Sequence, residues 1–300
     1  MRRVSLDLKR ATVGDVGGHS KSKDRSGPSL AMQGGFRILS RIAPSVAARA
    51  AEHVFRTPRR FERPAREWAW LANAQSFSFR LGRKSISAWH WGPDRPPVLL
   101  VHGWEGRGSQ LGAFVQPLVA AGHAVVAFDA CAHGSSPGRR SSLPEFVDAI
   151  FAASRRIGAI DAIVAHSMGA AATALAMSEG LSVSRAAFVA APANVSAIVK
   201  EFAAAIGISS YVRKKVEASI EATFQVRMEA LNMSSFASKM NSSLLVIHDS
   251  DDKEVPIGDG RVLAERWPHS TFLETKGLGH RRILRDPKVV RAVTEYLRRD

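Results

Sequence analysis

The sequence contains a single cysteine, Cys131, and this scarcity excludes two classes of structure. One cysteine cannot form an internal disulfide framework, and it cannot supply a zinc site built from thiolates. Apolar residues make up 45% of the 300 residues, a proportion typical of globular domains that bury a large core without such cross-links. A reducing compartment is therefore the expected setting.

Long apolar runs are also missing. No stretch of about 18 apolar residues occurs, so no transmembrane helix is predicted. Near the start, Asp7 and Lys9 follow Arg2 and Arg3 too closely to leave the apolar segment of a secretory signal. We therefore expect a cytoplasmic protein.

Acidic residues are scarce in the N-terminal part of the chain. Residues 1–66 hold 15 Lys/Arg against 5 Asp/Glu, and the remaining residues hold 27 against 22. A basic surplus of this kind predicts a solvated basic tail, and attraction to an anionic partner is the alternative. No nucleic-acid-binding module or aromatic platform accompanies it, so no nucleic-acid partner is expected.

The basic part divides into two segments. Residues 1–28 are rich in Gly, Ser, Lys and Arg and are predicted to be a disordered leader. Residues 29–66 are predicted to be an amphipathic basic helical extension, interrupted near Pro44. We expect this extension to pack on the parent domain or on a second subunit; the alternative is peripheral contact with a membrane surface. The oligomeric state stays open.

Residues 67–300 are predicted to form one α/β domain. Alternating apolar residues over 76–81 and 85–91 indicate an antiparallel pair. Short apolar runs separated by helical stretches follow, which is typical of a doubly wound, mostly parallel sheet. The runs are 98–101, 124–128, 162–165, 186–190, 244–248 and 271–274, and the helical stretches are 109–122, 143–157, 168–179, 257–267 and 287–299. One connection, about 192–243, is too long for a simple crossover and is predicted to be a small helical cap.

The chemistry centres on Ser167, which follows an apolar strand and precedes an alanine-rich helix. A serine in a sharp strand-to-helix turn requires small residues two positions before and after it, and Ala165 and Gly169 occupy those positions. The helix that begins at Met168 offers backbone N–H groups to a developing oxyanion. Ser167 is thus the candidate nucleophile.

Candidate partners of Ser167 follow the last two strands. Three aspartates lie beyond the strand 244–248, and His280 lies beyond the strand 271–274. Both positions are at strand carboxyl ends, where open α/β sheets bind their ligands, and the order Ser, Asp, His suits this fold. His102 is a rival base, but it precedes the nucleophile and lies in a loop suited to binding an oxyanion.

Together these motifs resemble the α/β-hydrolase-fold serine hydrolases, and most closely bacterial carboxylesterase/lipase-like members. The resemblance runs from about Ser76 to Asp300, although Ala165 and Asp249 stand where the family usually has glycine. It implies Asp252 as the acid, with Asp251 as the fallback, and an oxyanion hole formed by the Trp104 and Met168 N–H groups. The motifs are His102-Gly103-Trp104, Asp129-x-x-x-His133-Gly134-x-Ser136, Ala165-His166-Ser167-Met168-Gly169, Asp252-Lys253-Glu254-Val255-Pro256 and Gly279-His280.

The expected activity is hydrolysis of a carboxylic ester (EC 3.1.1 type) through an acyl-enzyme on Ser167, with His280 as base and Asp252 as orienting acid. The alternatives are an acyltransferase or thioesterase with the same triad, and a non-catalytic ligand-binding member of the fold. No cofactor and no metal are expected, and the partner is a small acyl substrate.

Overall fold

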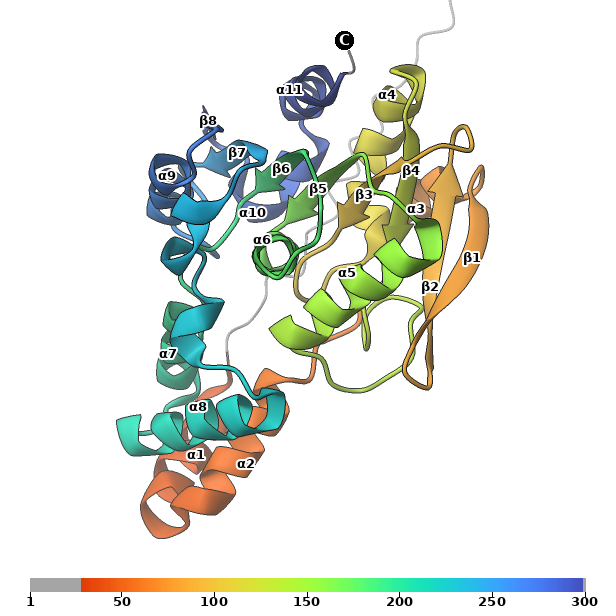
Figure 1. Ribbon diagram of the computed structural model, residues 1–300. Helices are drawn as coiled ribbons and strands as arrows, with labels where there is room; N and C mark the ends of the chain where they lie inside the picture. Colours follow the sequence, from red (N-terminus) through yellow and green to blue (C-terminus); the bar gives the residue numbers. More distant parts are fainter. Residues whose placement is uncertain (1–27, 299–300) are drawn as a thin grey trace, which may run out of the picture.

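The computed structural model describes residues 28–298, which form an α/β domain around one eight-stranded sheet (Figure 1). The strand order is β1-β2-β4-β3-β5-β6-β7-β8. Neighbours from β4 to β8 pair parallel, whereas β2 pairs antiparallel with β1 and β4. The predicted fold class is therefore confirmed. The strands are β1 (Gln75–Leu81), β2 (Lys84–Trp91), β3 (Pro97–Val101), β4 (Ala124–Phe128), β5 (Ala162–His166), β6 (Arg185–Val189), β7 (Ser243–Asp249) and β8 (Ser270–Thr275).

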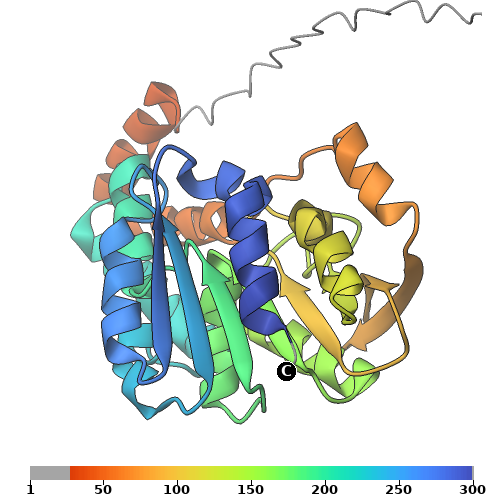
Figure 2. The ribbon, with the colours of Figure 1, turned by 90° about the horizontal axis from the view of Figure 1, so that it is seen from above.

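Helices cover both faces of the sheet, which explains the uninterrupted apolar runs. In β3, Leu99 and Val101 belong to one buried cluster and Val98 and Leu100 to the other. The first cluster lies under α5 (Leu143–Ile157), α6 (Met168–Ser178) and α9 (Ile257–Arg266). The second lies under η1 (Gly108–Phe114), α4 (Val115–Ala120) and α11 (Pro287–Leu297), which crosses the sheet in Figure 2.

A helical cap connects β6 to β7 and contains α7 (Val195–Ile206), α8 (Ser210–Phe224) and the short helices η2 (Met228–Leu231), η3 (Met233–Ser235) and η4 (Ala237–Lys239). Because β6 ends at Val189, the cap leaves the sheet at the carboxyl ends of the strands. Side chains of α7 and α8, including Val199, Val212 and Val216, are buried in the larger cluster. The cap is thus part of the main packing unit.

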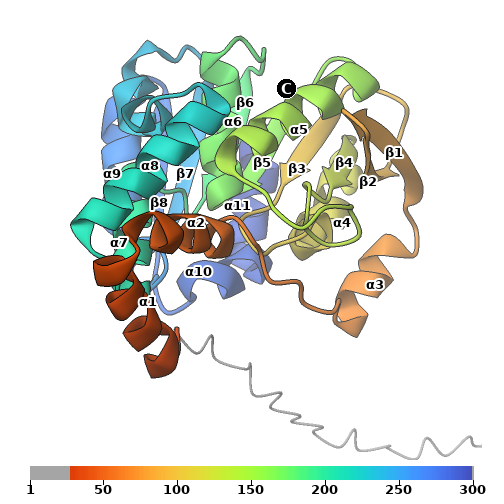
Figure 3. The ribbon, with the colours of Figure 1, turned by 90° about the horizontal axis from the view of Figure 1, so that it is seen from below.

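The N-terminal extension forms α1 (Leu30–Ile42) and α2 (Pro44–Phe55), which lie over the cap (Figure 3). Pro44 begins the second helix, a position where the missing N–H costs nothing. Helix α2 packs on α8, and α1 packs on α7. The predicted interruption near Pro44 is observed, and the extension packs on its own chain.

Some helical segments differ from the sequence-based expectation. Residues 109–122 are predicted as one helix, but a 3-10 helix occupies the first half and α4 the second. Helices α3 (Ala65–Leu71), α10 (Gly279–Arg282) and η5 (Ile283–Arg285) are additional to the predicted ones. The predicted disordered leader lies outside the described residues except for Pro28. Within residues 28–298, no helix is long and apolar enough to cross a membrane.

Candidate active site

Ser167 stands in a strained turn between β5 and α6. Its backbone has φ 53° and ψ −125°, and α6 begins at the next residue, Met168. A non-glycine residue with positive φ costs about 1–3 kcal/mol and persists only where the surrounding structure enforces it. Here the hydrogen bond from Ser167 N–H to the carbonyl of Val189, at 2.9 Å, ties the turn to β6. The turn lifts Ser167 above the sheet at a half-buried position.

Two glycines allow the strands and helices around Ser167 to approach closely. A Cβ at Gly169 would lie 2.3 Å from the carbonyl oxygen of His102. A Cβ at Gly103 would lie 2.8 Å from the Cβ of Ser167. The loop after β3 therefore runs directly against the serine turn, and side chains at either position would separate them.

His280 and Asp252 form a direct pair. His280 Nδ1 lies 2.8 Å from Asp252 Oδ2, and both side chains are almost fully buried. The other carboxylate oxygen of Asp252 accepts the N–H groups of Glu254 and Val255, at 2.8 and 3.0 Å. Burial opposes ionisation of Asp252, but contacts with His248 and His280 outweigh it and lower the pKa of the carboxyl. Asp252 is thus an anion aimed at the imidazole.

Asp251, the fallback acid, is exposed. Within residues 28–298, no bond joins its side chain to His280. Asp252, and not Asp251, therefore binds the imidazole of His280.

Asp249 anchors the loop that carries His280. This buried carboxylate accepts the N–H groups of Leu278 and Gly279, at 3.0 and 2.8 Å, and the hydroxyl of Thr275, at 2.7 Å. Burial raises the pKa of Asp249, but these hydrogen bonds, led by that of Gly279, lower it overall. A carboxylate at the usual glycine position therefore holds the loop that carries His280 against the end of β7.

His102 cannot readily act as the base. Ala130 N–H donates to its Nε2 at 2.9 Å, and its Nδ1 donates to the carbonyl of Gly103 at 2.7 Å. Burial lowers the pKa of His102 to about 4. Both ring nitrogens are engaged by the backbone, so His102 shapes the loop after β3.

The two predicted oxyanion donors lie on the two sides of Ser167. Trp104 follows Gly103, the glycine packed against the Ser167 side chain, and Met168 begins α6. Within residues 28–298, neither N–H has a hydrogen-bond acceptor in the protein. Two unengaged N–H groups near a serine at a helix N-terminus form a favourable site for negative charge.

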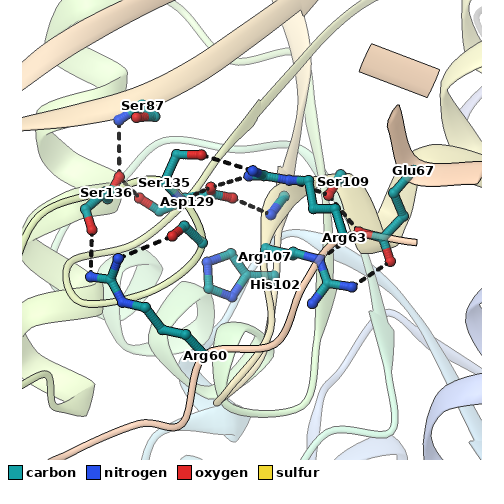
Figure 4. Close-up of polar contacts among 12 residues, drawn as sticks. Arg60, Arg63, Glu67, Ser87, His102, Arg107, Ser109, Asp129, Ser135 and Ser136 are labelled. Carbon is teal, nitrogen blue, oxygen red and sulfur yellow. Dashed lines mark hydrogen bonds and ion pairs between the residues drawn. The ribbon is translucent and has the colours of Figure 1, made fainter. Parts of the chain in front are cut away.

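An arginine-rich segment, residues 59–63, fastens the loops around the site. Arg59 donates to Glu105, the residue after Trp104, through its backbone N–H at 3.2 Å and its Nε at 3.0 Å. Arg60 donates to backbone carbonyls of the loop after β4, including that of Ser136 at 2.7 Å (Figure 4). Arg63 pairs with Asp129 at 2.5 Å. The end of the N-terminal extension thus braces both loops.

No hydrogen bond joins Ser167 Oγ to His280 Nε2 in the described part of the chain. Glu254 Oε2 lies 4.0 Å from that nitrogen. Catalytic hydrogen bonds are often loose in ligand-free sites and tighten when substrate binds. The described residues contain no cluster of three or more His, Cys, Asp or Glu suited to a metal ion.

A cavity lies in the cap. It has a volume of about 510 Å³ between α7, α8 and η2, and its lining includes Lys200, Arg213 and Glu217. Neither Ser167 nor His280 lines it. A charged, open cavity of this kind is separate from the serine turn.

Two residues of the site are not singled out by the sequence. His166 holds the His280 backbone, and Asp249 holds its loop. His166 stands inside the quoted motif around Ser167, and Asp249 appears only as a departure from the family's usual glycine; the partners of both are far away in the chain. The signal in the sequence is the residue type: His166 and Asp249 are polar at positions where a small or neutral residue would be sufficient.

Comparison with known proteins agrees with this architecture. The model of the alpha/beta hydrolase family matches residues 98–293. Solved structures with the same fold include a Pyrococcus furiosus esterase (17% identity, TM-score 0.61, covering 80% of this chain and 98% of that one). A second similar structure is a bromoperoxidase from Bacillus anthracis (19% identity, TM-score 0.57, covering 75% of this chain and 100% of that one). A third is Est1E from Butyrivibrio proteoclasticus with ferulic acid bound (17% identity, TM-score 0.58, covering 74% of this chain and 96% of that one). No curated protein sequence matches the chain.

Proposed function

Because the chain belongs to the alpha/beta hydrolase family, we propose that it is a serine hydrolase that cleaves a carboxylic ester through an acyl-enzyme on Ser167. The observation that carries the proposal is the buried pair of His280 and Asp252, at 2.8 Å, tied by its backbone to the residue before Ser167. The Pyrococcus furiosus esterase among the similar structures supports an ester as the substrate class.

In the proposed reaction, Ser167 Oγ attacks the ester carbonyl and His280 Nε2 takes its proton. Asp252 accepts the Nδ1 hydrogen of His280, which leaves Nε2 as the basic nitrogen and stabilises the imidazolium that forms. The proton then passes to the departing alkoxide. Water activated by the same nitrogen releases the acid and restores Ser167.

The negative charge of the tetrahedral intermediate falls on the ester oxygen. The N–H groups of Trp104 and Met168 are the proposed donors, each contributing roughly 3–4 kcal/mol to transition-state stabilisation. Their lack of an acceptor within residues 28–298 supports this role. The arginine-rich segment contributes by holding the side chain of Glu105, and with it the loop that carries the Trp104 donor.

Burst-phase hydrolysis of p-nitrophenyl esters of increasing chain length tests the proposal. The wild type is expected to give a burst followed by turnover, and Ser167→Ala is expected to lose both. Ser238→Ala, which removes an exposed hydroxyl from the cap, serves as the matched control and is expected to behave as the wild type.

A fluorophosphonate probe separates the alternatives. Labelling of the wild type but not of Ser167→Ala, with no ester turnover, would move the assignment to a thioesterase or acyltransferase with the same nucleophile. No labelling of the wild type would contradict the nucleophile and favour a non-catalytic binding protein.

A further inference from the structure

The N-terminal helices expose a row of large apolar side chains. Leu30, Ile38 and Ile42 on α1 are 85%, 63% and 74% exposed, and Val46 at the start of α2 is 52% exposed. Ile38 and Ile42 are four residues apart and therefore lie on one side of the helix. Exposed apolar residues that form a row on a helix mark an interaction surface, whereas isolated ones do not.

This row is not used for folding. The opposite side of the two helices supplies Phe36, Ala47 and Ala51, which are buried in the core cluster against the cap. Figure 1 shows α1 as the outermost helix at the cap end of the molecule, and Figure 3 shows α2 between it and the domain. The outward row is therefore available after the chain has folded.

The charge around the row has one sign. Arg37, Arg41 and Arg49 are exposed beside the apolar side chains, and residues 28–51 contain no acidic residue. The next acid along the chain, Glu52, is turned inward, where it accepts hydrogen bonds from Ser219 at 2.6 Å and Arg56 at 3.2 Å. Residues 1–27 add seven Lys/Arg against three Asp/Glu.

We propose that the outward face of α1 and the start of α2, the docking face, binds the surface of an anionic lipid bilayer. Such a surface takes apolar side chains at the headgroup boundary and attracts arginines with its phosphates. A symmetric second copy would place Arg37 and Arg41 against their own counterparts. A nucleic acid would match the arginines but would leave Leu30, Ile38 and Ile42 in water. An anionic bilayer satisfies both the apolar and the basic component of the face.

Docking in this way has a consequence for the site. The cap and the serine turn both lie at the carboxyl ends of the strands, and α1 and α2 cover the cap at this end (Figures 1 and 3). The docking face therefore brings the site side of the molecule toward the membrane. Binding itself needs no chemistry at Ser167, so Ser167→Ala is expected to dock as the wild type does, whatever its activity.

Co-sedimentation of the full chain with vesicles tests the proposal. We expect binding to phosphatidylcholine vesicles that contain phosphatidylglycerol, weaker binding as salt rises, and little binding to phosphatidylcholine alone. Arg37→Gln/Arg41→Gln is expected to weaken binding about 25-fold, on the basis of about fivefold per arginine near an anionic surface. Ile38→Ser/Ile42→Ser is expected to weaken it roughly tenfold or more.

Matched controls lie on the other helices. Val262→Ser changes an exposed apolar residue on α9, and Arg291→Gln an exposed arginine on α11. Both are expected to bind as the wild type. If Ile38→Ser/Ile42→Ser bound vesicles as the wild type does, the binding would come from basic residues elsewhere, and the proposed docking face would be wrong. The wild type could instead fail to bind vesicles and form a dimer in light scattering. If Ile38→Ser/Ile42→Ser then made this dimer monomeric, the face would bind a second copy of the chain, and the proposal would be wrong.

Discussion

His166 Nε2 donates a hydrogen bond to the backbone carbonyl of His280 at 2.9 Å. The two residues are 114 positions apart in the sequence. His166 precedes Ser167, and His280 carries the imidazole bound to Asp252. This bond joins the end of β5 to α10. The segments that carry the proposed nucleophile and the proposed base are therefore linked by the His166 side chain and the His280 carbonyl, not by a bond between Ser167 and the His280 imidazole.

Removal of the His166 donor is expected to lower kcat more than it changes KM. A hydrogen bond of this kind contributes about 0.5–1.5 kcal/mol, so His166→Ala is expected to reduce kcat for a p-nitrophenyl ester about three- to tenfold. His166→Gln keeps an N–H donor and is expected to recover part of the loss. A change confined to thermal stability, equal in both variants, would show that His166 only supports packing.

The assignment of the acid is tested by a pair of neighbouring substitutions. Asp252→Asn keeps the shape of the side chain but removes the charge and the acceptor that orient His280, so kcat is expected to fall by about four orders of magnitude with the fold retained. Asp251→Asn is the matched control, because Asp251 is exposed and does not reach the imidazole. Steady-state kinetics and circular dichroism of both variants provide the measurement. Equal losses in the two variants would contradict the choice of Asp252.

The third prediction concerns the close packing of α6 against the end of β3 at Gly169. In Gly169→Ala, the added Cβ would lie 2.3 Å from the carbonyl oxygen of His102 and 2.7 Å from that of Val101, both backbone atoms that cannot turn away. Overpacking against backbone is expected to lower the free energy of unfolding by about 3 kcal/mol or more and to separate α6 from β3.

The control for this change is Gly258→Ala. Gly258 lies in the first turn of α9, and a Cβ there would meet nothing within 4 Å. Alanine is the better helix former, so this variant is expected to gain up to about 1 kcal/mol. Urea unfolding compares the two. A Gly169→Ala protein as stable as Gly258→Ala would show that the approach of the helix and strand is not tight.

Much of the fold could be predicted because its signals are local. The strand 124–128 and the helix 143–157 have the predicted bounds, since apolar runs and a capping serine, Ser142, fix them within a few residues. The sequence does not distinguish the 3-10 helix in the first half of residues 109–122 from an α-helix. The choice between these two hydrogen-bond patterns depends on packing against the strands.

What the sequence could not reveal depends on contacts between distant residues. The arginine-rich segment has the composition of a basic surface, yet Arg60 and Arg63 bind loops more than 60 positions away. Nothing in the sequence around them signals a carbonyl cluster or a buried Asp129 as the partner. The contact between His166 and His280 has the same origin, because the order of strands in the sheet brings the ends of β5 and of the loop after β8 together.

Three buried histidines predict how stability depends on pH. Burial lowers the pKa of His102 to about 4 and the pKa values of His133 and His166 to about 3. In the unfolded chain each histidine titrates near 6.5. As pH falls below about 6.5, the unfolded state takes up protons that the folded state does not, so the free energy of unfolding decreases until the folded pKa values are reached. Each histidine contributes a slope of about 1.4 kcal/mol per pH unit.

His133→Gln isolates one of these contributions. The side chain donates from Nδ1 to the carbonyl of Cys131, a bond that a glutamine amide can replace. Urea unfolding between pH 6 and pH 4 is expected to show a slope about 1.4 kcal/mol per pH unit shallower than in the wild type. His53→Gln, at an exposed position on α2, is the matched control. If His133→Gln lowered stability equally at every pH, His133 would contribute packing alone, and the acid sensitivity would have to come from other groups.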